Sequence, residues 1–356
     1  MSSSSTRVDS LDILRGVAAL LVFGYHFIHV FGLQITSPWL IPFAYGWVGV
    51  HLFYVLSGFF ITVAVVAPNE FSFRRFMVRR VARIVPAYYL SIAVIVLLTH
   101  SYFITNLHGL YHLVMNLSFL HHFDFETMGS INGAYWTLGV EWFFYLSMAT
   151  AAPLLRGRWF WHTLATAVLF SWAWRTGVFL YEPMTDLNRF YYSGLLPGAL
   201  DEFAFGAVVA GIYIRRKPDT SISLARCQLT IVGGALLYLL ALLTIHYSSG
   251  IYWRQWWTVI FLPALLAAGF GLLVHAFTHL EKYRWLHILA RNSGMAYIGK
   301  VSFGIYIWHI PVLKAIAVEK YQYSHPLPLL LLGFIGVMVM ASLSYYLVED
   351  RFHPSR

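Results

Sequence analysis

The sequence predicts an all-α polytopic integral membrane protein with about ten transmembrane helices in one domain. Of the 356 residues, 59% are hydrophobic and 11% are charged, whereas a soluble globular chain carries about 25% charged residues. The mean hydropathy is +0.66, and apolar residues are spread over the whole length. These values exclude a soluble globular protein. We therefore expect residues 1–356 to form a single membrane domain without an appended soluble domain.

Ten segments qualify as spans, because a transmembrane helix needs about 20 mostly apolar residues. An even number places both termini on the same side of the membrane. The first apolar run contains Arg15 and lacks a small-residue cleavage site, so we expect no cleavable signal peptide. The predicted spans are residues 10–32, 45–66, 84–101, 133–155, 159–176, 197–214, 229–246, 256–276, 301–319 and 327–348.

Lysine and arginine are distributed unequally between the predicted loops. These residues collect in the short cytoplasmic loops of membrane proteins. With the N-terminus inside, the first inner loop carries five arginines between residues 74 and 83, whereas the outer loops carry only Arg189, Arg254 and Lys320. The asymmetry predicts cytoplasmic termini, and it explains the net charge of +9 without nucleic-acid binding.

Residues 102–132 do not fit a span. This stretch contains no lysine or arginine, and its apolar part, residues 110–120, is too short to cross a bilayer. We expect an outer-face loop with a short interfacial or re-entrant helix. Its ionisable residues are His108, His112, His121, His122, Asp124 and Glu126.

Ionisable side chains within spans are candidates for function, because charge is costly in the bilayer. Arg15 and His26 are eleven residues apart, which places them within about 20° of one helix face and roughly 16 Å apart along the axis. Two interpretations stay open. Either Arg15 reaches the inner headgroups and His26 is a hydrogen-bonded core residue, or arginine holds phosphate and histidine acts as a general base. A ligand that bridges both would be long, with an anionic end and a reactive end, which is the shape of an acyl-coenzyme A.

The first inner loop, FRRFMVRRVARIVP, also has two interpretations. Topology and anionic lipids alone favour positive charge at this place. Together with Arg15, however, the loop could form a cytoplasmic mouth that binds phosphate. Pro86 is expected to mark the start of the next helix.

Two further spans contain ionisable residues. Glu141 stands among aromatic residues in the fourth span, where a carboxylate is either protonated or partnered; structural pairing with an arginine or histidine is the alternative to a catalytic role. His309 in the ninth span precedes Pro311, whose ring is expected to free a backbone carbonyl. A hydrogen-bonded core residue is the alternative for His309.

Metal binding is not expected. The pairs His26 with His29 and His121 with His122 lack a third ligand at a defined spacing. The single cysteine, Cys227, excludes both an intramolecular disulfide and a cysteine-based metal site.

Clustered aromatic residues lie where interfacial belts are expected. Stacking on a sugar is the alternative to a belt. The residues concerned are Tyr191, Tyr192, Trp253, Trp256 and Trp257.

Five motifs in chain order resemble those of the acyltransferase 3 family, membrane-embedded acyltransferases that modify extracytoplasmic sugars and some small molecules. The resemblance covers nearly the whole chain. The motifs are LDILRGVAALLVFGYH with Arg-x10-His (Arg15, His26), FYVLSGFFI with Ser-Gly-Phe (Ser57, Gly58, Phe59), RRVARIVP with Arg-x-x-Arg (Arg80, Arg83), WTLGVEWFFYL with Glu141, and FGIYIWHIP with Tyr-x-x-His-x-Pro (Tyr306, His309).

The sequence departs from the family pattern in two places. Trp142 stands where the fourth motif has a second glutamate, so any proton handling that needs two acids must use Glu141 alone or another group. The closing Glu-Lys-Pro element is matched only loosely, by Glu349, Asp350 and Pro354.

The resemblance implies an O-acyltransferase, in the first instance an O-acetyltransferase, in the cytoplasmic membrane. It would take the acyl group from cytoplasmic acetyl-coenzyme A, its co-substrate, and deliver it to a hydroxyl of an extracytoplasmic carbohydrate. It implies catalytic roles for His26 and Glu141, either by base catalysis or through an acyl-enzyme. It further implies donor binding by Arg15, Ser57, Arg80 and Arg83, and support from Asp12, Tyr306 and His309.

A proton-coupled transporter or flippase is the alternative, since buried histidine and glutamate also form proton relays. Transporters often contain inverted repeats with interrupted helices, and the sequence shows none. A purely structural membrane protein would not need Arg15, His26 and Glu141 in apolar surroundings.

Overall fold

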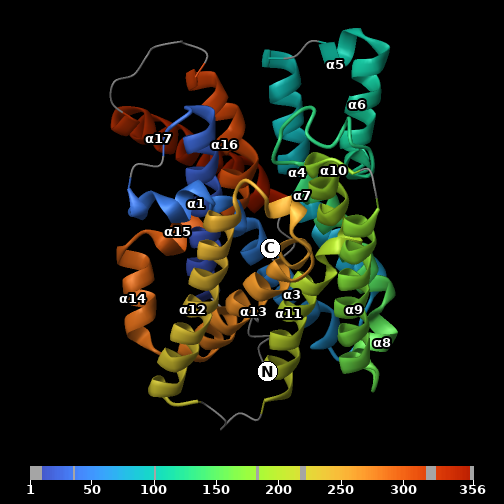
Figure 1. Cartoon of the computed structure of the whole chain (residues 1–356), viewed down its shortest axis with the longest axis vertical. Helices are drawn as coiled ribbons and strands as arrows, with labels where there is room; N and C mark the ends of the chain where they lie inside the picture. The colour runs from blue at the N-terminus through green and yellow to red at the C-terminus, as the bar shows by residue number, and fades with distance from the viewer. Residues whose placement is uncertain are drawn as a thin grey trace.

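The chain is folded almost entirely into helices. A computed structural model describes residues 10–34, 37–99, 102–181, 184–216, 222–317 and 326–352, and every regular element in these ranges is helical (Figure 1). The predicted all-α class is confirmed. Five residues that carry the predictions of charge and motifs lie outside the described residues. They are Lys320 and Pro354, named above, and Arg7, Lys217 and Arg356, which add positive charge on the predicted inner side.

Seven helical segments are long and apolar enough to cross a membrane. They are α1 (Ser10–Val30), the unit of η2 (Gly46–Val48) and α3 (Gly49–Val66), α4 (Phe73–Thr99), α11 (Leu196–Arg215), α12 (Leu224–Ser248), α13 (Trp256–Leu280), and α17 (Pro326–Ser344) with the turns η5 (Tyr345–Glu349) and α18 (Asp350–Phe352).

The other three predicted spans also fall on helices. These are α7 (Trp136–Thr150), α9 (Phe160–Leu180) and α16 (Ser302–Ala317). With 15 and 16 residues, α7 and α16 are shorter than a typical span of about 20 residues. Tryptophan, histidine, threonine and arginine lower the hydropathy of α9. A polytopic membrane protein is thus supported, while the number of ten crossings and the side of the termini stay predictions.

The start of α4 differs from the prediction. The helix begins at Phe73 and includes all five arginines of the expected inner loop, and Pro86 lies inside it, so the expectation that Pro86 begins the helix was wrong. Arginine is a good helix former. An internal proline costs about 3 kcal/mol, which packing can outweigh, and the neighbouring Ile84, Ala87 and Tyr88 are buried. Arg80 and Arg83 are therefore held on a rigid helix.

Residues 102–132 contain the expected short helix. It is α6 (Leu107–Leu117), preceded by α5 (Tyr102–Thr105) and followed by η3 (His121–Phe123). The 11 residues of α6 span about 16 Å, too little to cross a bilayer. In Figure 1, α5 and α6 lie at the top of the view, at the level of the upper part of α4.

Glycine residues bring several interior helices into backbone contact. A Cβ atom at Gly58 would lie 2.1 Å from the carbonyl oxygen of Phe203, and one at Gly206 would lie 1.9 Å from that of Val55. Such small residues allow close helix packing in membranes. The Ser-Gly-Phe motif therefore seats α3 directly on α11, which fixes the direction of the neighbouring Ser57 side chain.

Short helices complete the chain. They are η1 (Pro38–Leu40), α2 (Ile41–Ala44), α8 (Ala152–Arg156), α10 (Asp186–Gly194), η4 (Tyr252–Arg254), α14 (Arg284–Asn292) and α15 (Met295–Lys300).

Candidate active site

Two cavities adjoin inside the helical bundle. The smaller, of about 90 Å³, is lined by Arg15, Arg80 and Arg83 and is called the arginine cavity. The larger, of about 520 Å³, is lined by His26 and His51 and is called the histidine cavity. Both are lined by the same three residues, Val50, Tyr54 and Tyr306, so these side chains form the junction between them.

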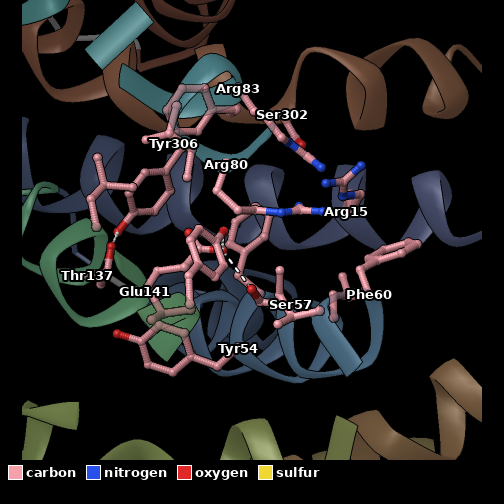
Figure 2. A pocket seen from close by; sticks show the side chains of 18 residues that line it. Arg15, Tyr54, Ser57, Phe60, Arg80, Arg83, Thr137, Glu141, Ser302 and Tyr306 are labelled. Carbon is pink, nitrogen blue, oxygen red and sulfur yellow. Dashed lines mark hydrogen bonds between the residues drawn. The ribbon is translucent and has the colours of Figure 1, made fainter. Parts of the chain in front are cut away.

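Three guanidinium groups approach one another in the arginine cavity (Figure 2). Arg15 Nη1 is 3.3 Å from Asp12 Oδ1, and the Arg15 guanidinium lies over the ring of Phe60. Arg80 Nε is buried without a hydrogen-bond partner in the described part of the chain. The residues predicted to converge therefore do so. Their use in binding phosphate stays a prediction.

Glu141 lies in the same cavity and is held by hydroxyl groups. Ser57 Oγ donates to Glu141 Oε1 at 2.7 Å, and the Tyr145 hydroxyl donates to the same oxygen. The spacing of four from Thr137 to Glu141 and Tyr145 places all three on one face of α7, and all three line the cavity. Among the described residues, the hydrogen-bond partners of Glu141 are thus hydroxyls.

Trp142 points elsewhere. Its ring stacks on Phe119 with centroids 4.7 Å apart and an interplanar angle of 13°, and it is absent from the lining of both cavities. The residue that replaces the second glutamate is thus part of the core in this chain.

His26 lines the histidine cavity and is paired with His309. His309 Nδ1 lies 2.7 Å from the Tyr306 carbonyl oxygen. Because a carbonyl only accepts, this nitrogen carries the hydrogen, and His309 Nε2 is left as an acceptor. His26 Nδ1 lies 3.1 Å from that Nε2 and 3.0 Å from the Val22 carbonyl oxygen. The proton of neutral His26 is therefore on Nδ1, and its Nε2 keeps the lone pair that a base requires.

The segment around His309 is anchored by two hydrogen bonds from α7 and the residues before it. Asn132 Nδ2 donates to the Ile307 carbonyl oxygen at 2.9 Å, the carbonyl that Pro311 leaves without an intrahelical partner, as predicted. The Tyr306 and Thr137 hydroxyls are 2.6 Å apart (Figure 2). These bonds fix Tyr306 at the junction.

The predicted site residues thus fall into two groups. His26 and Glu141 line different cavities, His309 lies behind His26, and Asp12 lies beside Arg15. The arginine cavity contains Arg15, Ser57, Arg80, Arg83, Glu141 and Tyr306; the histidine cavity contains His26 and Tyr306.

Sequence reasoning missed a buried polar group in the histidine cavity. His51 Nδ1 lies 2.6 Å from Glu202 Oε2, and both side chains line the cavity together with Arg175. Arg175 Nη1 donates to Asp201 Oδ1 at 3.1 Å, and both of these side chains are essentially inaccessible. The sequence did contain a signal for this group. Asp201 and Glu202 lie next to each other in the predicted span 197–214, and ionisable residues within a span are candidates for function, as for Glu141.

Tyr54 was also missed. Its hydroxyl is buried and has no hydrogen-bond partner among the described residues, although its ring lines both cavities. A buried hydroxyl without a partner is costly, so a ligand group at the junction is its natural partner. No sequence signal distinguishes Tyr54 from the other aromatic residues of its span.

Aromatic rings form much of the remaining wall of the histidine cavity. Trp47, Trp136 and Trp253 line it. The place of Trp253 in this wall is compatible with the alternative of sugar stacking, while the interfacial belt stays a prediction. Trp256 and Trp257 are 56% and 38% exposed, as a belt requires.

The fold and the site together define a multi-helix membrane protein with two adjoining internal cavities lined by polar residues. A family model described as an acyltransferase domain matches residues 8–349. The chain belongs to the acyltransferase 3 family, which confirms the resemblance of its motifs.

Curated relatives carry acetyltransferase names. The chain is 26% identical to the peptidoglycan O-acetyltransferase OatA of Listeria monocytogenes over 96% of its own length and 55% of the relative. It is 25% identical to the putative peptidoglycan O-acetyltransferase YrhL of Bacillus subtilis, covering 96% of the chain and 54% of the relative. It is 27% identical to the putative acetyltransferase ORF330 of Acidianus two-tailed virus, covering 83% and 81%.

The chain therefore spans about half the length of the two peptidoglycan O-acetyltransferase relatives. No solved structure matches it.

Proposed function

We propose that this protein is a membrane O-acetyltransferase. It takes an acetyl group from cytoplasmic acetyl-coenzyme A and transfers it to a hydroxyl of an extracytoplasmic carbohydrate, such as a polysaccharide or a lipid-linked glycan. The observation that carries the proposal is the contact between an arginine-lined cavity and a histidine-lined cavity at Tyr54 and Tyr306. The names of the relatives support acetyl as the group transferred.

The arginine cavity suits the donor. Guanidinium groups bind phosphate with charge-assisted, often paired hydrogen bonds, and Arg80 Nε has no partner among the described residues. A volume of about 90 Å³ is below the roughly 300–1,000 Å³ of pockets that hold drug-sized ligands. The cavity therefore takes the thin end of the donor, with the phosphates at its arginine-lined mouth. Ser57 and Glu141 can exchange hydrogen bonds with the amides of a pantetheine arm.

The histidine cavity suits the acceptor. Its volume of about 520 Å³ lies within the usual range for small-ligand pockets, roughly 300–1,000 Å³. Trp47, Trp136 and Trp253 offer flat apolar faces, and His51 and Glu202 offer polar atoms that can bond sugar hydroxyls. A neutral sugar needs both kinds of contact.

The chemistry requires one base and one donor at the junction. His26 Nε2 removes the acceptor hydroxyl proton while the oxygen attacks the thioester carbonyl carbon. The Tyr54 hydroxyl donates a hydrogen bond to the oxyanion that forms. The intermediate collapses, the carbon–sulfur bond breaks, and the thiolate takes the proton from His26, which yields the ester and free coenzyme A. Brief acylation of His26 before transfer is the second route.

The direct test uses purified protein, labelled acetyl-coenzyme A and a panel of carbohydrate acceptors that includes peptidoglycan fragments. We expect labelled ester and free coenzyme A. Because base catalysis contributes about 10²–10⁴-fold, His26→Ala should lose transfer by that factor and keep donor binding. The control, His29→Ala, should be mild, because His29 is exposed and does not line the cavity. A transporter would release no coenzyme A, and that result would refute the proposal.

The orientation needs its own test. Cys227 is fully buried, so impermeant thiol reagents cannot report its side. In a Cys227→Ala background, Asn69→Cys should be labelled only from the cytoplasm, because exposed Asn69 precedes the arginine-rich start of α4. Gly250→Cys, exposed beside Ser249 of the histidine cavity, should be labelled only from outside. The opposite pattern would reverse the proposed sides of donor and acceptor.

A further inference from the structure

Three metal-binding side chains converge outside both cavities, in the segment between α4 and α7. His108 and His112 lie one turn apart on α6, and Glu126 follows η3. Their ligand atoms all lie within 4.8 Å of one another. Glu126 Oε1 is 3.0 Å from His108 Nε2 and 3.8 Å from His112 Nε2.

These distances suit a tetrahedral zinc ion. Zinc binds histidine nitrogen at about 2.0–2.1 Å and carboxylate oxygen at about 2.0–2.2 Å, so neighbouring ligand atoms stand roughly 3.3 Å apart. The two distances to Glu126, 3.0 Å and 3.8 Å, lie on either side of that value. The side chains of His108 and Glu126 are 52% and 59% exposed, so both are free to adjust around an ion.

The ring of His112 is buried and is not hydrogen-bonded to Glu126. Its side chain is only 7% exposed, and its Nδ1 is buried without a partner in the described ranges. Its Nε2 is 3.8 Å from Glu126 Oε1, beyond hydrogen-bond distance. The Nε2 lone pair is therefore not tied to Glu126 by a hydrogen bond and is available as a metal ligand.

His108 is oriented by two neighbouring residues. The hydroxyl of Tyr102 lies 2.7 Å from His108 Nδ1, and a bond at the outer nitrogen orients a metal-binding histidine. Asn106 Oδ1 accepts from the His108 backbone nitrogen at 2.8 Å and caps α6 at the turn that carries this ligand.

We propose that His108, His112 and Glu126 bind one zinc ion, with water at the fourth position. Two imidazoles and a carboxylate are a donor set that zinc accepts. The ion would join α6 to the segment after η3, in which Met128 and Gly129 line the histidine cavity. Zinc would thus brace one wall of that cavity, whatever group the protein transfers.

The test is zinc binding by the full-length protein, purified without a histidine tag and treated with chelator. Calorimetry should show one equivalent of zinc, with a higher unfolding temperature when zinc is present, and cobalt should give the visible spectrum of a tetrahedral site. His108→Gln and Glu126→Gln change exposed side chains, so both should fold, and each should weaken zinc binding at least about tenfold. The matched control, His162→Gln, changes an exposed histidine on α9 and should leave binding unchanged.

The proposal is overturned if the untreated wild type contains no zinc and the chelator-treated wild type takes up none, or if both variants bind zinc as tightly as the wild type. Loss of binding in His162→Gln alone would also overturn it, because the site would then lie elsewhere. None of these outcomes depends on acetyl transfer, so the zinc site and the proposed activity fail or stand separately.

Discussion

Replacing His309 tests whether its ring holds His26 in the tautomer needed for base catalysis. His309 Nε2 accepts from His26 Nδ1 at 3.1 Å, but the Val22 carbonyl oxygen, at 3.0 Å, accepts from the same nitrogen. Loss of His309 therefore removes one of two interactions. A hydrogen bond contributes about 0.5–1.5 kcal/mol and about 1.36 kcal/mol is tenfold in rate, so we expect a loss of about 2- to 13-fold.

Two substitutions at this position isolate the effect. The amide nitrogen of asparagine takes the place of Nδ1, whereas the amide of glutamine reaches the place of Nε2. His309→Asn keeps a donor for the Tyr306 carbonyl but offers no acceptor to His26, so it should show the full loss of kcat/KM. His309→Gln can present an oxygen to His26 and should stay close to the wild type. The assay is acceptor-dependent release of coenzyme A from acetyl-coenzyme A.

Two outcomes would refute this reasoning. A loss near the roughly 10²–10⁴-fold expected for removal of a general base would make His309 a participant in the chemistry. Equal activities of His309→Asn and His309→Gln would show that the acceptor at Nε2 does not matter. Because His309 is fully buried, folding of each variant is checked by thermal unfolding before rates are compared.

Three further predictions concern other groups. Arg80→Ala should weaken donor binding about 13- to 160-fold, which corresponds to the roughly 1.5–3 kcal/mol of a hydrogen bond to a charged group. Arg80→Lys should restore donor binding only partly. The control, Arg74→Ala, changes an exposed arginine outside the cavity and should leave donor binding unchanged. Tyr54→Phe should lower kcat about 10²–10³-fold, as expected for loss of an oxyanion donor, with unchanged donor affinity in equilibrium binding. Burial lowers the pKa of His122 from 6.5 to about 4. Between these two pH values the unfolded chain binds a proton at His122 and the folded chain does not, so the free energy of unfolding decreases as the pH falls. His122→Asn keeps a donor for the Phe119 carbonyl oxygen. Its unfolding temperature should therefore decrease less between pH 6.5 and pH 4 than that of the wild type.

Much of the site could be predicted because helical geometry is regular. The interval between Arg15 and His26 predicted one helix face, and α1 does present both residues to the two connected cavities. Pro311 predicted a freed carbonyl, and Asn132 binds it. Both inferences need only the period of a helix and the missing proline N–H.

What could not be predicted depends on which helices touch. One partner of Glu141 is Ser57, which lies 84 residues away in the chain on another helix. The division into two cavities depends on how α3 and α16 place Tyr54 and Tyr306 in the lining of both cavities. Composition and spacing describe one helix at a time, so neither result was accessible from them.

The interval between Arg15 and His26 also separates the tasks of Glu141 and His26. Along α1 it measures roughly 16 Å, on the order of the reach of a pantetheine arm. Donor phosphates held at Arg15 would therefore place the thioester near the junction with the histidine cavity, where His26 and Tyr54 lie. Glu141, already bonded to Ser57 and Tyr145 within the arginine cavity, would lie beside the arm and not at the reacting carbon. Glu141→Gln should accordingly raise the KM for acetyl-coenzyme A more than it lowers kcat. His26→Ala should lower kcat more than it raises this KM. A Glu141→Gln variant with unchanged KM and a kcat lowered about a hundredfold would instead place Glu141 in the chemical step.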